Sequence, residues 1–264
     1  MSQPPVLMSV DARGVATLTL NRPEVGNAYD GALIEAAFNC MMQLSERTDL
    51  RVVVIRGNGR HFQVGADLSW LESVRQQSPD HNVRASRAVA DLMRRLNHLP
   101  VPTVALVQGA CFGGGTGLIA SCDIVIGADN ARFSIAETRW GMMAGIIIPQ
   151  LNDAISVRQV RRYALTGERF DAAEALRIGL IHQIVPPDNL AAEGARIVDA
   201  LLQNAPHANA LTKQVALEYA WSDLSERDFD RLVEQHAGKR QSPEAQEGLA
   251  SFHGKRPANW YTPT

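Results

Sequence analysis

The amino-acid sequence predicts an α/β core followed by a mainly helical C-terminal region. In the first 190 residues, short apolar runs typical of buried strands alternate with segments whose apolar residues recur at helical spacing. After about residue 190 the strand signals stop and helical patterns remain. A chain of 264 residues can bury one large core with a smaller appendage. We therefore expect an α/β core over residues 1–190 and a helical region over residues 191–264.

The chain opens with a predicted β-hairpin. Its strands, Val6–Val10 and Val15–Leu20, are rich in β-branched and apolar residues, and the turn between them contains a glycine that can adopt a positive φ. Apolar residues at helical spacing then predict a helix over residues 30–47. The β-branched run at residues 52–55 is typical of a strand buried on both faces.

The same alternation continues along the chain. A helix over residues 88–99 is expected to end before Pro100 and Pro102, because proline cannot continue the helical hydrogen bonds. A buried strand at Thr103–Val107, a helix over 113–121 and a strand over 123–126 follow. The C-terminal region contains predicted helices over residues 189–203, 208–220, 224–236 and 243–252.

The composition excludes several classes of partner. A formal net charge of -2 and a pI near 6.4 provide no general attraction to nucleic acid or to anionic membranes. No apolar stretch approaches the roughly 18 residues of a membrane span, and no signal peptide is apparent. The cysteines Cys40, Cys111 and Cys122 form no CxxC pair, which argues against a disulfide framework or a metal site. We expect a cytoplasmic protein that binds no metal.

Two glycine-bearing turns follow predicted buried strands and lead into helices. They are GNGRHFQVGAD at residues 57–67 and GACFGGGTG at residues 109–117. The first N–H groups of a helix are unpaired and carry partial positive charge, so two such turns facing each other could hold one oxygen atom. Taken alone, a three-glycine run after a strand is more often a tight turn or close helix packing than a ligand site. This run matches neither the dinucleotide-binding fingerprint nor the P-loop.

Four motifs in this order resemble the crotonase, or enoyl-CoA hydratase/isomerase, superfamily. They are NRPEVGNA at 21–28, HFQVGADL at 61–68, VQGACFGGGTGLIASCDIVIGAD at 107–129 and ARFSIAET at 131–138. The resemblance implies a spiral of ββα units around two nearly perpendicular sheets. It also implies C-terminal helices that build a homotrimer, often paired into a hexamer. The implied substrate is an acyl-CoA thioester, with coenzyme A as part of the substrate and no separate cofactor.

The resemblance also assigns roles to individual residues. The N–H groups of Ala66 and Gly114 are expected to form an oxyanion hole, in which each donor is worth about 3 kcal/mol of barrier, and Glu137 is expected to be the acid/base. The positions at which relatives contact coenzyme A are Arg22, Ala28, Gly65, Asp67 and Leu68. For Arg22, a solvated surface position is an equally good interpretation.

The reaction depends on how many carboxylates the site holds. Hydratases of this family carry two glutamates, and the position of the first is here Gly117, which leaves Glu137 alone. Burial beside an acyl pocket should raise the pKa of Glu137 and suit it to proton transfer near neutral pH. A single glutamate fits an enoyl-CoA isomerase. It also fits a hydratase subgroup that the chain resembles closely, the 3-methylglutaconyl-CoA and 3-isohexenylglutaconyl-CoA hydratases of leucine and acyclic terpene catabolism.

We therefore predict hydration of a 3-substituted glutaconyl-CoA. The alternatives are isomerisation and a non-catalytic crotonase-fold trimer. Substrates of this subgroup carry a second carboxylate, for which Arg139 is the nearest basic candidate. The residues at 140–148, including Met142, either line a pocket for a branched chain or belong to the core. Gly117 is expected to leave room that a second glutamate would fill.

Overall fold

The computed structural model describes residues 3–220 and 225–262. It begins with the predicted hairpin, in which β1 (Val6–Val10) and β2 (Val15–Leu20) pair antiparallel. The carboxylate of Asp11 accepts hydrogen bonds from the backbone N–H groups of Arg13 and Val15, at 2.9 and 3.0 Å. Gly14 takes the positive φ, 77°, that closes the turn. The hairpin prediction is confirmed.

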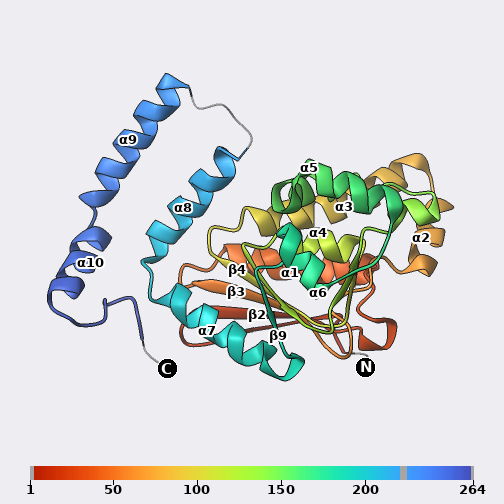
Figure 1. The fold of residues 1–264 in the computed structure, drawn as a ribbon, viewed down its shortest axis with the longest axis horizontal. Helices are drawn as coiled ribbons and strands as arrows, with labels where there is room; N and C mark the ends of the chain where they lie inside the picture. The colour runs from red at the N-terminus through yellow and green to blue at the C-terminus, as the bar shows by residue number, and fades with distance from the viewer. Residues whose placement is uncertain (1–2, 221–224, 263–264) are drawn as a thin grey trace.

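A six-stranded sheet forms the centre of the molecule (Figure 1). Its order is β1-β2-β3-β4-β6-β9, and every pair after the hairpin is parallel. Side chains alternate between its two faces, so the β-branched runs are buried on both sides, as the sequence predicted. The added strands are β3 (Val52–Gly57), β4 (Thr103–Val107), β6 (Ile124–Ala128) and β9 (Gln183–Val185).

Short extended segments form a second layer. Along the chain, most of them follow a strand of the large sheet and precede a helix. The layer contains the sheet of β5 (Ala110–Phe112), β7 (Arg132–Ser134) and β8 (Phe170–Asp171). Parallel bridges extend the layer, because Tyr29 pairs with Ala66 and Gln63 pairs with Cys111. The chain therefore repeats one pattern, a long strand, a short second strand and a helix, which is the ββα unit that the resemblance implied.

Each short segment leads directly into a helix. The segment at residues 27–29 precedes α1 (Gly31–Ser45), and the segment ending at Ala66 precedes α2 (Leu68–Arg75). In the same way β5 leads into α4 (Gly114–Ala120), and β7 leads into the short 3-10 helix η2 (Glu137–Trp140). Because the segments lie side by side and parallel, their ends come together at one edge of the layer, which we call the helix-start edge.

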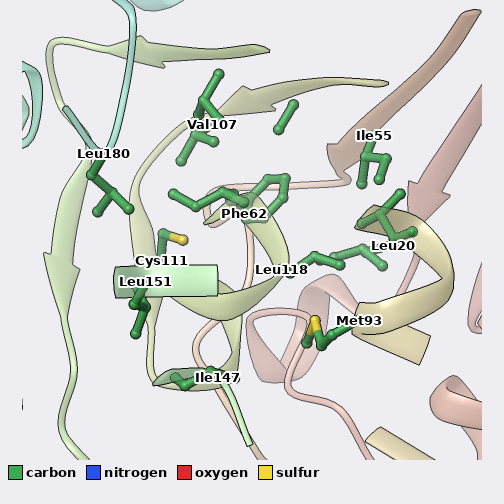
Figure 2. Close-up of a cluster of buried hydrophobic side chains, with 14 of the residues drawn as sticks. Leu20, Ile55, Phe62, Met93, Val107, Cys111, Leu118, Ile147, Leu151 and Leu180 are labelled. Carbon is green, nitrogen blue, oxygen red and sulfur yellow. The ribbon is translucent and has the colours of Figure 1, made fainter. Parts of the chain in front are cut away.

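The helices cover both faces of the large sheet. On one face, α1 and α4 pack with α3 (Pro79–Asn97) and α5 (Ile148–Thr166) over the larger core cluster, in which Phe62, Leu118 and Leu151 meet (Figures 1 and 2). On the other face, α7 (Leu190–Leu202) packs against alternate strand residues such as Val104. The packing on the sheet thus extends to Leu202, beyond the boundary expected at residue 190. The remaining elements are α6 (Ala172–Ile178), η1 (Pro23–Val25) and η3 (Pro187–Asn189).

Three C-terminal helices, α8 (Pro206–Glu218), α9 (Glu226–Arg240) and α10 (Pro243–His253), lie to one side of the sheet (Figure 1). None of their residues is fully buried. Lys213 fastens α8 to the core, where its ammonium lies 2.8 Å from Asp123 and donates to the carbonyl of Val101. Large apolar side chains on these helices are exposed, namely Leu211, Phe229, Val233, Leu249 and Phe252.

Some elements differ from the sequence prediction. The helix expected over 88–99 begins at Pro79, where Ser78 accepts a hydrogen bond from the N–H of His81. The helices α2 and α5 were not predicted. The start of the helix expected over 224–236 lies outside the described residues, and α9 begins at Glu226. Within the part of the chain that the structure describes, no helix combines the length and apolarity that a membrane span requires.

Candidate active site

A cavity of ≈ 980 Å³ opens at the helix-start edge. Residues from all four repeats reach it, because the ends of their short segments meet there. Of the residues singled out from the sequence, Arg22 and Gly117 do not line the cavity. Those that line it are Ala28, Gly65, Ala66, Asp67, Leu68, Gly114, Glu137, Arg139 and Met142.

The backbone N–H groups of Ala66 and Gly114 are free at this edge. Tyr29 donates to the carbonyl of Gly65 at 2.9 Å and accepts from the N–H of Asp67 at 2.8 Å, and this parallel pairing skips the N–H of Ala66. Gly114 is the first residue of α4, where no intrahelical acceptor exists. Among the residues that the structure describes, neither N–H donates to a protein acceptor. Both groups can therefore serve a ligand oxygen.

The glycines of this run leave no room for a Cβ, because other side chains approach them closely. A Cβ on Gly113 would lie 3.0 Å from Oε1 of Glu137, and a Cβ on Gly114 would lie 2.6 Å from Cε1 of Tyr29. Gly113 also has a positive φ of 51°. Gly65 is equally close to this turn, since its Cβ would lie 3.2 Å from the carbonyl oxygen of Phe112. Of the two interpretations that the sequence left open, close packing is therefore present, and it coincides with the cavity.

Glu137 stands at the start of η2, with its carboxyl over Gly113. Its Oε2 atom is buried and has no hydrogen-bond partner among the described residues. Burial raises the pKa of Glu137, and the N–H groups of Glu137 itself and Ala136 oppose this effect only in part. A carboxyl in this environment can both take and return a proton near neutral pH.

Arg22 is neither solvated nor free. Its guanidinium lies 3.1 Å from Asp30 and 3.3 Å from Asp67, and its side chain is 19% exposed. It also donates to the carbonyl of Ala28 at 2.6 Å. Asp67 in turn caps α2 by accepting from the N–H groups of Ser69 and Trp70. Arg22 thus fastens two helix starts together, and its contact with coenzyme A stays a prediction.

The buried side chain of Asn27 holds the preceding loop. Its Nδ2 donates to the carbonyls of Asn58 at 2.9 Å and His61 at 2.8 Å, and also approaches Phe62. Its Oδ1 accepts from the N–H of Arg22 at 2.8 Å. The residue adopts a positive φ of 58°, which asparagine tolerates better than most residues. Asn27 therefore sets the position of the first loop against the second.

The structure corrects the sequence prediction that Gly117 leaves free space in the site. Gly117 is buried, and a Cβ there would lie 2.2 Å from Cγ2 of Ile147 and 2.6 Å from its Cβ. The side chain of Ile147, drawn in Figure 2, fills the place and is itself 2% exposed. The sequence could not show this, because Ile147 comes from a loop 30 residues further along the chain.

Two arginines flank the cavity on the side of η2. Arg139 packs on Gly167, whose Cβ would lie 2.8 Å from Nε of Arg139. Arg169 lies over the ring of Phe112, with 5.1 Å between its Cζ and the ring centroid. Both side chains are exposed, and in the described ranges 3–220 and 225–262 neither forms an ion pair. The rim therefore carries two positive charges that can meet an anionic group.

Comparisons with known proteins agree with this geometry. The family model described as enoyl-CoA hydratase/isomerase matches residues 11–263. The chain is 31% identical over 257 residues to mevalonyl-coenzyme A hydratase sidH of Aspergillus fumigatus, with 96% of this chain and 94% of that protein covered. It is 29% identical to the mitochondrial Delta(3,5)-Delta(2,4)-dienoyl-CoA isomerase of Dictyostelium discoideum, with 93% and 87% covered.

Among solved structures, an enoyl-CoA hydratase from Shewanella pealeana superposes with a TM-score of 0.92 at 34% identity, covering 97% of this chain and 96% of that one. The fold and site thus define an acyl-CoA enzyme of the crotonase fold. The chain belongs to the enoyl-CoA hydratase/isomerase family.

Two residues that sequence reasoning missed also line the cavity, Tyr29 and Arg169. Tyr29 directly follows the first motif, so its position beside Ala28 was a usable signal. Arg169 was not singled out from the sequence, because the pairing of Phe170 with Phe133 is what brings its strand to the site.

The free N–H of Gly114 can be tested with a matched pair of variants. Gly114→Ala and Gly114→Pro both add a Cβ against Tyr29, but only proline removes the N–H. We expect the proline variant to have a kcat on an enoyl-CoA thioester at least about 100-fold below that of the alanine variant. Circular dichroism would control for folding. Equal kcat values in two folded variants would exclude Gly114 from the oxyanion hole.

Proposed function

We propose that this enzyme adds water to a 2-enoyl-CoA thioester whose acyl group ends in a second carboxylate, of the 3-methylglutaconyl-CoA or 3-isohexenylglutaconyl-CoA type. One observation supports this proposal most strongly. The cavity holds a buried carboxyl, Glu137, together with the free N–H groups of Ala66 and Gly114, and two arginines without ion-pair partners in the described part of the chain lie on its rim. The mevalonyl-CoA hydratase among its relatives supports water chemistry on a branched acyl thioester.

The chemistry follows from the positions of these groups. The N–H groups of Ala66 and Gly114 hold the thioester oxygen and stabilise the negative charge that develops when a nucleophile attacks Cβ. Glu137 takes a proton from water as the C–O bond forms at Cβ. The same carboxyl then returns the proton to Cα, which restores the charged form of Glu137. Ala28, Gly65, Asp67 and Leu68 remain candidates for coenzyme A contacts, because they line the cavity.

Arg139 and Arg169 are the proposed partners of the distal carboxylate. A guanidinium can bind a carboxylate through two parallel hydrogen bonds. Met142 lines the same part of the cavity, and the neighbouring Met143 and Ile146 are exposed there at 78% and 37%. Flexible apolar side chains beside two arginines suit a branched chain that carries a terminal charge.

Enoyl-CoA isomerisation is the second candidate. One carboxyl can move a proton between two carbons without water, and one relative is a dienoyl-CoA isomerase. A non-catalytic trimer is the third possibility. Product mass separates the three, because hydration adds one water to the thioester, isomerisation leaves its mass unchanged, and a scaffold protein leaves the substrate intact.

We further propose that the enzyme works as a homotrimer or a dimer of trimers in the cytoplasm. The exposed apolar side chains of α8, α9 and α10, Phe229 and Phe252 among them, are the surface that such an assembly would bury. The cysteines Cys40, Cys111 and Cys122 are free, which suits a reducing compartment.

Replacing Glu137 tests the reaction. On a panel of linear enoyl-CoA and 3-substituted glutaconyl-CoA thioesters, we expect Glu137→Gln to lower kcat for water addition by about 10² to 10⁴ with little change in thioester affinity. In the wild type, kcat should fall as the pH drops through the raised pKa of Glu137, because only the carboxylate can accept the proton of water. Near wild-type kcat in Glu137→Gln would move the acid/base role elsewhere.

The same variant has a stability readout. A carboxyl whose pKa is raised by folding contributes stability below its unfolded pKa, and that contribution is lost as the pH rises through the folded pKa. The melting temperature of Glu137→Gln should therefore exceed that of the wild type at neutral pH, and the difference should vanish below about pH 4.

Substrate charge recognition is tested with Arg139→Gln and Arg169→Gln. Each should raise KM for a 3-substituted glutaconyl-CoA by about 10-fold or more, the scale of a charged hydrogen bond, and leave KM for uncharged crotonyl-CoA unchanged. Arg161→Gln is the matched control, because Arg161 is exposed and does not line the cavity. Equal effects on both substrates would contradict a role in charge recognition.

Assembly is tested by solution mass. We expect light scattering at micromolar concentration to give three or six times the chain mass of 28.8 kDa. Replacing exposed Phe229 and Phe252 with Asp should shift the population toward smaller species, because charge would then face the apolar surface. A wild-type mass near 28.8 kDa would show that the assembly proposal is wrong.

A further inference from the structure

Tyr29 touches both halves of the oxyanion hole. Its backbone pairs with Gly65 and Asp67 on either side of Ala66. Its ring packs directly on Gly114, where a Cβ would lie 2.6 Å from Cε1 and 3.2 Å from the hydroxyl oxygen. The ring of Trp70 meets it edge to face at 5.9 Å. The phenol is therefore held between Gly114 and Trp70, next to the two proposed oxyanion donors.

The hydroxyl of Tyr29 is available to a ligand. Tyr29 lines the cavity together with Glu137, and within the described part of the chain its hydroxyl has no protein hydrogen-bond partner. Burial and the nearby charge of Glu137 raise the pKa of Tyr29 to about 12. The phenol thus keeps its proton at neutral pH and can both donate and accept a hydrogen bond.

A site with one carboxylate offers the reacting water one hydrogen-bonding side chain where a two-glutamate site offers two. Water that gives one hydrogen to Glu137 and points a lone pair at Cβ needs a second contact to fix its orientation. Ile147 fills the space at Gly117, so no group can reach the water from there. Two other polar side chains of the cavity are engaged, since Ser134 donates to the carbonyl of Gly167 and Asp67 caps α2. Tyr29 remains beside Glu137.

We propose that the Tyr29 hydroxyl is a catalytic group that holds the reacting water against Glu137 and so takes over, from a different position, the role of a second glutamate. This inference rests on the proposed hydratase function. The water oxygen bonds to Cβ, its proton passes to Glu137, and the π electrons move to the enolate held by Ala66 and Gly114. Glu137 then protonates Cα. Tyr29 is bound to the water throughout and ends the cycle with its own proton.

The test uses Tyr29→Phe, which keeps the ring that packs on Gly114 and Trp70 and removes only the hydroxyl. Two reactions are measured on the full-length protein. Hydration of 3-methylglutaconyl-CoA requires the water. Exchange of the Cα protons of the saturated analogue 3-methylglutaryl-CoA with deuterium from solvent requires Glu137 and the oxyanion hole, but no water at Cβ.

We expect Tyr29→Phe to lower kcat for hydration by about 10- to 100-fold, with KM changed less than about threefold and deuterium exchange retained. Glu137→Gln should lose both reactions. Tyr261→Phe is the matched control and should retain both, because the hydroxyl of Tyr261 binds Asp199 and does not line the cavity.

The outcomes separate this inference from the function on which it rests. Wild-type hydration together with an unchanged kcat in Tyr29→Phe overturns the role of Tyr29 alone. An equal loss of hydration and deuterium exchange also overturns it, because Tyr29 would then support Glu137 or the oxyanion loop and not the water. A wild-type protein that adds no water to any thioester of the panel overturns the proposed function and the water-holding role together.

Discussion

One buried amide, the side chain of Asn27, determines how the active-site loops lie against each other. It is fully buried, and its hydrogen bonds join the loop after β2 to the carbonyls of Asn58 and His61 after β3. The same amide donates to the carbonyl of buried Phe62, and a buried carbonyl left without a partner costs about 1–3 kcal/mol. The register of Tyr29 against Ala66 follows directly from this junction, so the free N–H of Ala66 depends on it.

The repeated ββα pattern explains why one edge collects the chemistry. Each short segment ends where a helix begins, and a helix start provides unpaired N–H groups and partial positive charge. Four successive repeats place Tyr29, Ala66, Gly114 and Glu137 at equivalent positions. The proposed oxyanion donors and the proposed acid/base therefore come from different repeats, yet they share one layer. Arg22 reinforces that layer by pairing with the capping carboxylates of α1 and α2.

Local patterns predicted the large sheet well, because β-branched runs such as Thr103–Val107 are typical only of strands buried on both faces. The short segments were harder to predict. Three residues, as in β5, carry too little periodicity to be distinguished from a loop. The motifs located Glu137 and Gly114 in the sequence, and the structure places both at one cavity. Contacts between distant segments were not predictable, as Ile147 at Gly117 and Arg169 on Phe112 show.

The Ile147 contact changes how the single glutamate is understood. At Gly117, where the resemblance to hydratases places a second glutamate, a buried apolar side chain fills the space. Burial raises the pKa of Glu137, whose Oε2 has no protein partner among the described residues. An unpaired buried carboxyl oxygen is costly to fold, so its presence is more typical of a functional site than of a structural one. The packing at Gly117 and the burial of Glu137 together leave one carboxyl to handle the proton in the proposed reaction.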